Sequence, residues 1–205
     1  MSVEENIRFA TAHLSTGVRL HYAEQGHPTG EALIFLHGYS DSWFSFSQVL
    51  PWLSPAYHAF ALTERGHGDS DKPECCYTLD DFAADVDAFM DALGIDQVTL
   101  VGHSEGGLIA QRVALDYPNR VSRLVLIGTA AKGSAFRGVS ELGEFVRTLE
   151  DPVAPEFVRE FQESTIYHPI PEEFLDTVVS ESLKLPARVW CDYFEGVVLA
   201  DAVQR

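Results

Sequence analysis

Short apolar runs alternate with amphipathic stretches over the first two thirds of the chain. Continuous apolar runs are typical of strands buried on both faces of a parallel sheet, and they cover residues 32–36, 57–62, 97–101 and 122–127. Apolar residues at helical spacing predict helices over residues 44–53, 81–93 and 108–117. At the start, residues 7–13 and 18–24 alternate apolar and polar positions around Ser15-Thr16-Gly17, which predicts a β-hairpin.

The pattern changes at about residue 134. Successive helical stretches follow, prolines separate them, and no strand pattern appears among them. They cover residues 139–150, 155–167, 171–184 and 187–204. This order predicts an α/β fold, with a mostly parallel sheet and helices on both faces over residues 1–133, followed by an all-helical segment over residues 134–205.

The third strand-like run leads into Gly-His-Ser-Glu-Gly at residues 102–106, and a predicted helix follows. A turn from strand to helix as tight as this strains its central residue, and side chains at Gly102 and Gly106 would collide with neighbouring backbone. The free N–H groups and the positive dipole end of the helix lie where an oxyanion would develop. Ser104 is therefore the candidate nucleophile.

This strand, turn and helix resemble the nucleophile elbow of the α/β-hydrolase family. Two further segments also resemble motifs of that family. One is His37-Gly38-Tyr39, and the other, which lies between it and the Ser104 turn, is Arg65-Gly66-His67-Gly68-Asp69-Ser70. Together they resemble the branch of small esterases, carbon–carbon bond hydrolases, lactonases and cofactor-free haloperoxidases. The resemblance covers roughly residues 7–130 with ordered motifs, and the remainder more loosely.

The resemblance implies a role for several residues. The backbone N–H groups of Tyr39 and Glu105 would form an oxyanion hole beside Ser104, and such donors are each worth about 10²–10³ in rate. His67 corresponds to a structural residue, and the side chain of His37 is also expected to be structural. The helical segment would be a cap over the active site. Residues that support the motifs are His37, Gly38, Gly102 and Gly106.

A serine hydroxyl also needs a histidine to take its proton and a carboxylate to orient that histidine. The family order is serine, then acid, then histidine, and the stretch 128–131 carries no carboxylate. His103 is poorly placed because the elbow turns adjacent side chains apart, and His168 lies in the helical segment. We therefore expect the relay acid and histidine beyond Arg205, in a chain that represents a truncated hydrolase.

The same ordering leaves the strand at residues 122–127 as an open apolar edge of the sheet. An unpaired strand edge is a template for association. We expect a homo-oligomer, poor stability, or a further segment that completes the sheet at this edge.

Composition narrows the choice of partners. Fourteen basic side chains against 31 acidic ones give a net charge of −17, which argues against nucleic acid and anionic membranes as partners. The N-terminus has no apolar core of a signal peptide, and no run is long enough to span a membrane. Cys75 and Cys76 are adjacent, and neighbours rarely pair, so reduced thiols in a cytoplasmic protein are expected together with Cys191. No metal or cofactor is expected.

The leading interpretation is a serine hydrolase acting on a small apolar ester or a related acyl or carbon–carbon bond. One alternative is a non-catalytic ligand-binding or signalling protein on the same scaffold, and another is a cofactor-free haloperoxidase or perhydrolase. Dehalogenases and related epoxide hydrolases place an aspartate where Ser104 stands, so the motif argues against both. Aromatic residues of the helical segment could line an apolar pocket, although most are expected to form its core. They are Phe136, Phe145, Phe157, Phe161, Tyr167, Phe174, Trp190, Tyr193 and Phe194.

Overall fold

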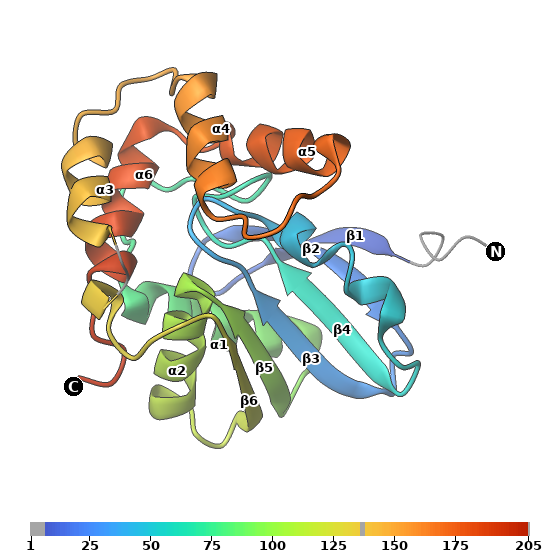
Figure 1. Cartoon of the computed structure of the whole chain (residues 1–205). Helices are drawn as coiled ribbons and strands as arrows, with labels where there is room; N and C mark the ends of the chain where they lie inside the picture. Colours follow the sequence, from blue (N-terminus) through green and yellow to red (C-terminus); the bar gives the residue numbers. More distant parts are fainter. Residues whose placement is uncertain (1–6, 136–137, 205) are drawn as a thin grey trace.

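A six-stranded mixed sheet forms the centre of the protein (Figure 1). The computed structural model describes residues 7–135 and 138–204. The strand order is β1-β2-β4-β3-β5-β6; β2 is antiparallel to β1 and β4, and the other neighbours are parallel. The predicted hairpin, the strands and the mostly parallel α/β architecture are confirmed. The strands are β1 (Arg8–His13), β2 (Arg19–Gly26), β3 (Glu31–Leu36), β4 (Tyr57–Leu62), β5 (Val98–His103) and β6 (Val121–Ile127).

Two α-helices, α1 (Leu79–Leu93) and α2 (Glu105–Asp116), pack against each other and cover one face of the sheet. Helix α1 begins with a capping box, in which the Thr78 hydroxyl and the Asp81 carboxylate each bind the other residue's backbone N–H. Its end is fixed by Gly94, which takes the left-handed conformation at φ 66°. The end of this helix agrees with the predicted range 81–93, whereas its start lies two residues earlier, at Leu79.

The opposite face of the sheet is covered differently from the prediction. The expected helix over residues 44–53 is wrong: the segment forms two 3₁₀ turns, Trp43–Phe46 and Leu50–Trp52. Pro51 lacks an N–H and cannot continue an α-helix at this position, which limits the segment to single turns. Phe46 and Leu50 from these turns are buried against β3 and β4 and form a second, smaller core.

The helical segment lies over the end of the sheet to which the parallel strands point (Figure 1). Its helices are α3 (Val139–Val146), α4 (Pro155–Ser164), α5 (Glu172–Ser182) and α6 (Ala187–Tyr193). No helix among the described residues is long and apolar enough to cross a membrane.

The last predicted helix, over residues 187–204, is too long. Helix α6 passes into a π-helical turn, Phe194–Val198, after which the chain pairs with the segment that follows β6. The N–H of Gly133 donates to the carbonyl of Ala200 at 2.9 Å, and the N–H of Ala202 donates to the carbonyl of Ala131 at 2.9 Å. These long-range backbone bonds replace helical ones, and a local pattern does not encode them.

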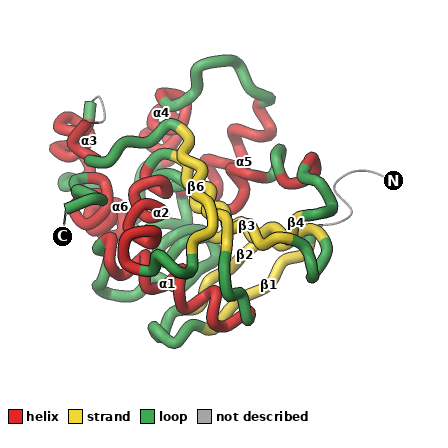
Figure 2. The backbone as a smooth tube through the Cα atoms, turned by 90° about the horizontal axis from the view of Figure 1, so that it is seen from below, coloured by secondary structure: helices red, strands yellow, loops and turns green. Residues whose placement is uncertain are grey.

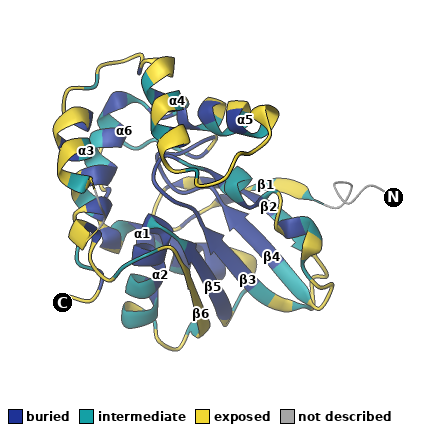
Figure 3. Ribbon diagram, viewed as in Figure 1, coloured by how far each residue is buried: buried dark blue, intermediate teal, exposed yellow. Residues whose placement is uncertain are grey.

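Strand β6 forms one edge of the sheet (Figure 2), and most of its residues are exposed (Figure 3). Alternate residues of a strand point to opposite faces of the sheet. Because consecutive residues of β6 are exposed, the strand is exposed on both faces. The exposed fractions are 37% for Leu124, 43% for Val125, 43% for Leu126 and 46% for Ile127. The predicted apolar edge is thus observed among the described residues.

The expectation that all cysteines are reduced is wrong for one pair. Cys75 and Cys76 form a disulfide between neighbouring residues, whereas Cys191 is free. Cys76 has a positive φ of 75°, a conformation that non-glycine residues seldom take.

Candidate active site

The candidate site lies where the strand order reverses. From β3 the chain goes to β4 on one side and returns to β5 on the other, so loops leaving β3 and β5 diverge and leave a crevice between them. Leu36 of β3 pairs with Gly102 of β5, so the residues after both strands emerge at the same edge. This register brings the loop containing Tyr39 next to Ser104, although 65 positions separate them in the sequence.

Ser104 occupies a strained turn between β5 and α2, with φ 52° and ψ −120°. Its neighbours explain why the turn contains glycines. A Cβ atom on Gly102 would lie 2.5 Å from the carbonyl oxygen of Gly106, and one on Gly106 would lie 2.3 Å from the carbonyl oxygens of both His37 and Leu36. The strand and helix therefore approach closely enough to fix the direction of the serine side chain.

His37 anchors the facing loop through backbone contacts. Its Nδ1 lies 2.9 Å from the carbonyl oxygen of Gly38, to which it donates, and its Nε2 accepts the N–H of Glu64 at 3.1 Å. Complete burial lowers the pKa of His37 to about 4, so the ring is neutral at physiological pH. A Cβ on Gly38 would lie 3.2 Å from the Ser104 Cβ. The absence of a side chain at Gly38 therefore avoids a close contact with Ser104.

The two predicted oxyanion donors, Tyr39 and Glu105, come from different elements next to Ser104. Glu105 is the first residue of α2, where N–H groups have no partner within the helix and the helix dipole is positive. Tyr39 supplies the second N–H from the loop after β3. The predicted pair of donors therefore lies on two elements that the sheet holds side by side.

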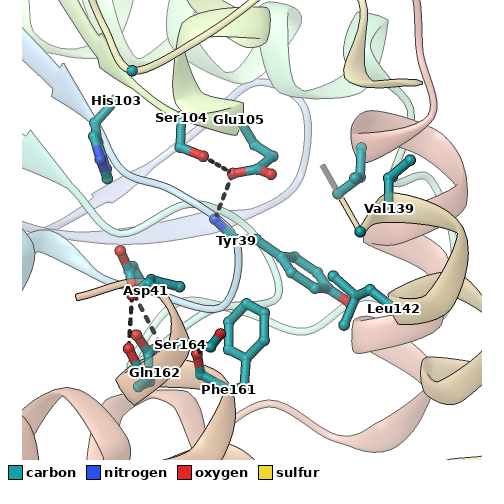
Figure 4. Close-up of a pocket in the computed structure, with 14 residues that line it drawn as sticks. Tyr39, Asp41, His103, Ser104, Glu105, Val139, Leu142, Phe161, Gln162 and Ser164 are labelled. Carbon is teal, nitrogen blue, oxygen red and sulfur yellow. Dashed lines mark hydrogen bonds between the residues drawn. The ribbon is translucent and has the colours of Figure 1, made fainter. Parts of the chain in front are cut away.

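The carboxylate of Glu105 lines the cavity beside the Tyr39 donor. Its Oε2 accepts the Tyr39 N–H at 3.2 Å and also accepts the hydroxyl of Ser104 (Figure 4). The side chain is almost fully buried, with 8% of its surface exposed. A single carboxylate oxygen thus contacts both the candidate nucleophile and one candidate oxyanion donor.

A cavity of about 470 Å³ opens beside Ser104, within the usual range for small-molecule sites. The loops after the strands and helix α4 supply most of its polar residues, and the helical segment supplies most of its apolar residues. The lining residues are Tyr39, Asp41, His103, Ser104, Glu105, Gly128, Gly138, Val139, Leu142, Phe161, Gln162, Ser164, Thr165 and Val198.

Asp41 and Gln162 connect the two walls of this cavity, and no local pattern pointed to either residue. The Gln162 amide nitrogen on α4 lies 3.1 Å from Asp41 Oδ1, 3.1 Å from the Ser40 hydroxyl and 2.9 Å from the Ser182 hydroxyl on α5. Burial raises the pKa of Asp41 to about 7, while hydrogen bonds from Ser45 and Gln162 oppose the shift. These contacts fix α4 over the candidate site.

Other histidines of the described chain do not act as partners of Ser104. His103 lines the cavity but makes no hydrogen bond to the Ser104 hydroxyl, and burial lowers its pKa. His168 is exposed and lies outside the cavity lining. Neither histidine was expected to serve as the base for Ser104, and neither forms a hydrogen bond with the Ser104 hydroxyl.

One buried group has the residue types of a metal site: His37, Glu64 and His67, whose ligand atoms lie within 4.8 Å of one another. His37 already uses Nε2 to accept a backbone N–H, and His67 Nδ1 lies 2.9 Å from the carbonyl oxygen of Arg65. Within this group, only Glu64 Oε1 and His67 Nε2 are without a hydrogen bond. Two free ligands from one loop are fewer than metal sites use.

The aromatic residues of the helical segment divide among its core, the cavity and the surface. Trp190, Tyr193 and Phe194 are fully buried around the Tyr39 ring, while Phe161 lines the cavity. Phe145 and Tyr167 are exposed, and Phe136 lies outside the described residues.

The chain is similar in sequence to curated proteins that are named epoxide hydrolases. Epoxide hydrolase 3 of Mus musculus is 36% identical over 114 residues, which are 55% of this chain and 31% of the mouse protein. Epoxide hydrolase 2 of Siraitia grosvenorii is 40% identical over 114 residues, which are 54% of this chain and 35% of that protein. The match thus spans about a third of the length of these curated relatives.

Similarity of the fold extends further along the chain. The crystal structure of a bromoperoxidase from Bacillus anthracis aligns with a TM-score of 0.83 at 21% identity, over 95% of this chain and 75% of that one. A family model described as alpha/beta hydrolase fold matches residues 31–163, which is well over half of the chain. The chain belongs to the α/β-hydrolase fold family.

Proposed function

We propose that the chain is part of a serine hydrolase that acts on a small ester or a related acyl or carbon–carbon bond. In this proposal Ser104 is the nucleophile, and the backbone N–H groups of Tyr39 and Glu105 form the oxyanion hole. The observation that carries the proposal is the strained Ser104 at φ 52°, with the Tyr39 N–H opposite and the start of α2 beside it. Strain of this kind persists only where the surrounding structure imposes it, and it is frequent at catalytic groups.

In the proposed reaction the Ser104 oxygen attacks the carbonyl carbon and its proton passes to a general base. The carbonyl oxygen becomes an oxyanion that accepts hydrogen bonds from the N–H groups of Tyr39 and Glu105. Collapse of the intermediate expels the alcohol, and water then hydrolyses the acyl-serine ester. The proposal includes a histidine base and its carboxylate partner, contributed by a part of the native protein outside this chain.

The cavity suggests the size and polarity of the substrate. A volume of about 470 Å³ accommodates a small molecule rather than a polymer. Val139, Leu142 and Phe161 of the helical segment supply apolar surface to the cavity. We therefore assign the helical segment the role of a cap that selects a small acyl group with apolar character.

Epoxide hydrolysis is a second candidate, favoured by the sequence likeness to proteins named epoxide hydrolases. Chemistry separates it from the first. A carboxylate that opens an epoxide forms an ester, which water can cleave, whereas a serine oxygen would form an ether, which water does not cleave. With Ser104 as the nucleophile, an epoxide would therefore trap the enzyme instead of being turned over.

The test compares p-nitrophenyl esters with styrene oxide as substrates of the native protein. We expect ester hydrolysis, loss of that activity in Ser104→Ala by on the order of 10⁴ or more, and no diol from the epoxide. Ser180→Ala is the matched control, since Ser180 is an exposed serine on α5. Diol formation that survives Ser104→Ala would overturn the proposal. Adding hydrogen peroxide and assaying peracid tests the perhydrolase alternative in the same preparation.

A further inference from the structure

The carboxylate of Glu105 lies in the place that the proposed mechanism reserves for substrate. Its Oε2 accepts the Tyr39 N–H at 3.2 Å and the hydroxyl of Ser104. An oxyanion formed by attack of Ser104 would be bonded to the serine oxygen through one carbon atom and would need the same Tyr39 N–H. The side-chain carboxylate and the substrate oxygen therefore compete for one donor.

The carboxylate of Glu105 also places a negative charge in the cavity. Glu105 follows Ser104 directly at the start of α2, so its carboxylate stays within a side-chain length of the reacting atoms even when it leaves the Tyr39 N–H. Asp41 is the other acidic residue of the lining, and no lysine or arginine occurs among the described lining residues. Like charges about 6–10 Å apart, at an effective dielectric constant of about 20, disfavour one another by about 10- to 100-fold.

We propose that Glu105 is the specificity-determining residue of this site: its carboxylate occupies the oxyanion hole until a substrate carbonyl displaces it, and it selects neutral or cationic acyl substrates over those with a carboxylate near the scissile bond. The inference rests on the proposed serine hydrolase function. It assigns the side chain of Glu105 a role separate from that of its backbone N–H.

Two substitutions separate the two effects. Glu105→Gln removes the charge but keeps a side-chain oxygen that can accept the Tyr39 N–H. Glu105→Met removes both the charge and the acceptor at similar length. Glu160→Gln is the control, because Glu160 is an exposed acidic residue on α4.

The first measurement is kcat/KM of the native protein and each variant for p-nitrophenyl butyrate and for the singly charged p-nitrophenyl hemisuccinate. Both Glu105 variants should raise the ratio of anionic to neutral rates by about 10- to 100-fold. Only Glu105→Met should also raise the neutral rate, by about tenfold, since it alone empties the hole. An unchanged ratio in both variants would overturn the charge selection.

The second measurement does not depend on turnover. The amide proton of Tyr39, followed by NMR in protein labelled with nitrogen-15, should shift markedly in Glu105→Met, less in Glu105→Gln, and not in Glu160→Gln. An unshifted Tyr39 amide in Glu105→Met would overturn the occupied oxyanion hole. If Ser104→Ala retains turnover of p-nitrophenyl butyrate, the serine hydrolase function itself fails. If Ser104→Ala loses that turnover and the Glu105 variants behave as the native protein, only the present inference fails.

Discussion

At the scale of single residues, Asp41 shows how burial controls chemistry at the cavity. Its carboxyl group accepts from Gln162 at 3.1 Å and lies near the charge of Glu105, and burial raises its pKa to about 7. The native protein therefore holds a proton on Asp41 over a pH range in which the unfolded chain, with a carboxyl pKa near 3.8, does not. The unfolded state becomes relatively more favourable as pH rises through this range.

We expect Asp41→Asn to remove a pH dependence of stability. The native protein should lose up to about 4 kcal/mol between pH 4 and pH 8 through this group, whereas the asparagine side chain keeps a hydrogen-bonding oxygen without titrating. The check is the free energy of urea unfolding at several pH values. Parallel curves for the two proteins would contradict the assignment of the raised pKa to Asp41.

The sequence predicted some residues of the site and not others, for a physical reason. Ser104 follows from a strand, a turn and a helix that are contiguous in the chain. The contact between Gln162 and Asp41 joins positions 121 residues apart, and it depends on where α4 packs relative to the sheet. The side-chain position of Glu105 likewise depends on the loop after β3, which the local pattern does not encode.

At the scale of elements, the close approach of α2 to β3 fixes the elbow. Gly106 lies against the carbonyl oxygens of His37 and Leu36, so the backbone of α2 contacts the backbone at the end of β3 directly, with no side chain between them. Elements with local end signals, such as α1, were predicted well. The segment 44–53 and the end of α6 were predicted poorly, because Pro51 and long-range backbone pairing override their apolar spacing.

We expect Gly106→Ala to destabilise the fold by about 3 kcal/mol or more, although alanine favours a helix by up to about 1 kcal/mol over glycine. The added Cβ would lie 2.3 Å from two carbonyl oxygens, so β3 or α2 must shift. Gly94→Ala is the control: it has φ 66° and no atom within 4 Å of an added Cβ, so only backbone strain of about 1 kcal/mol is expected. Equal losses in thermal unfolding would contradict the close approach.

A buried ion pair joins α1 to the loop after β4. Arg65 donates to both carboxylate oxygens of Asp85 at 2.6 Å, and the Thr16 hydroxyl donates to the same carboxylate at 2.6 Å. Removing one partner of such a pair leaves the other charge buried and alone.

We expect Asp85→Ala to cost about 3–5 kcal/mol of unfolding free energy, whereas the exposed pair between Arg159 and Asp176 should contribute little because solvent screens it. Asp176→Ala is the matched control, measured by the same chemical denaturation. A small loss for Asp85→Ala would show that water reaches Arg65.

At the scale of the whole molecule, the edge strand β6 is the least protected part of the sheet. Its apolar residues 124–127 are 37–46% exposed, and an edge of this kind offers unpaired backbone groups to another strand. We propose that the isolated 205-residue chain associates with itself through this edge, or is completed there by a further segment. The prediction of an open edge followed from the order of elements, while its partner does not follow from the sequence.

We expect sedimentation velocity of the isolated chain to show mass increasing with concentration. Val125→Lys combined with Ile127→Lys should shift the distribution to monomer, because lysines on an edge strand oppose pairing. Phe9→Lys on the opposite edge strand is the control and should leave association unchanged. A monodisperse native chain with a cooperative thermal transition would contradict an associating edge.

The central claim is that Ser104 is an activated nucleophile beside an oxyanion hole. The most direct measurement is the reaction of the native full-length protein with a fluorophosphonate, followed by intact-mass and peptide mass spectrometry. We predict one adduct per chain on the peptide that contains Ser104, and none in Ser104→Ala. Absence of the adduct in the native protein, or its appearance on another residue, would contradict the account.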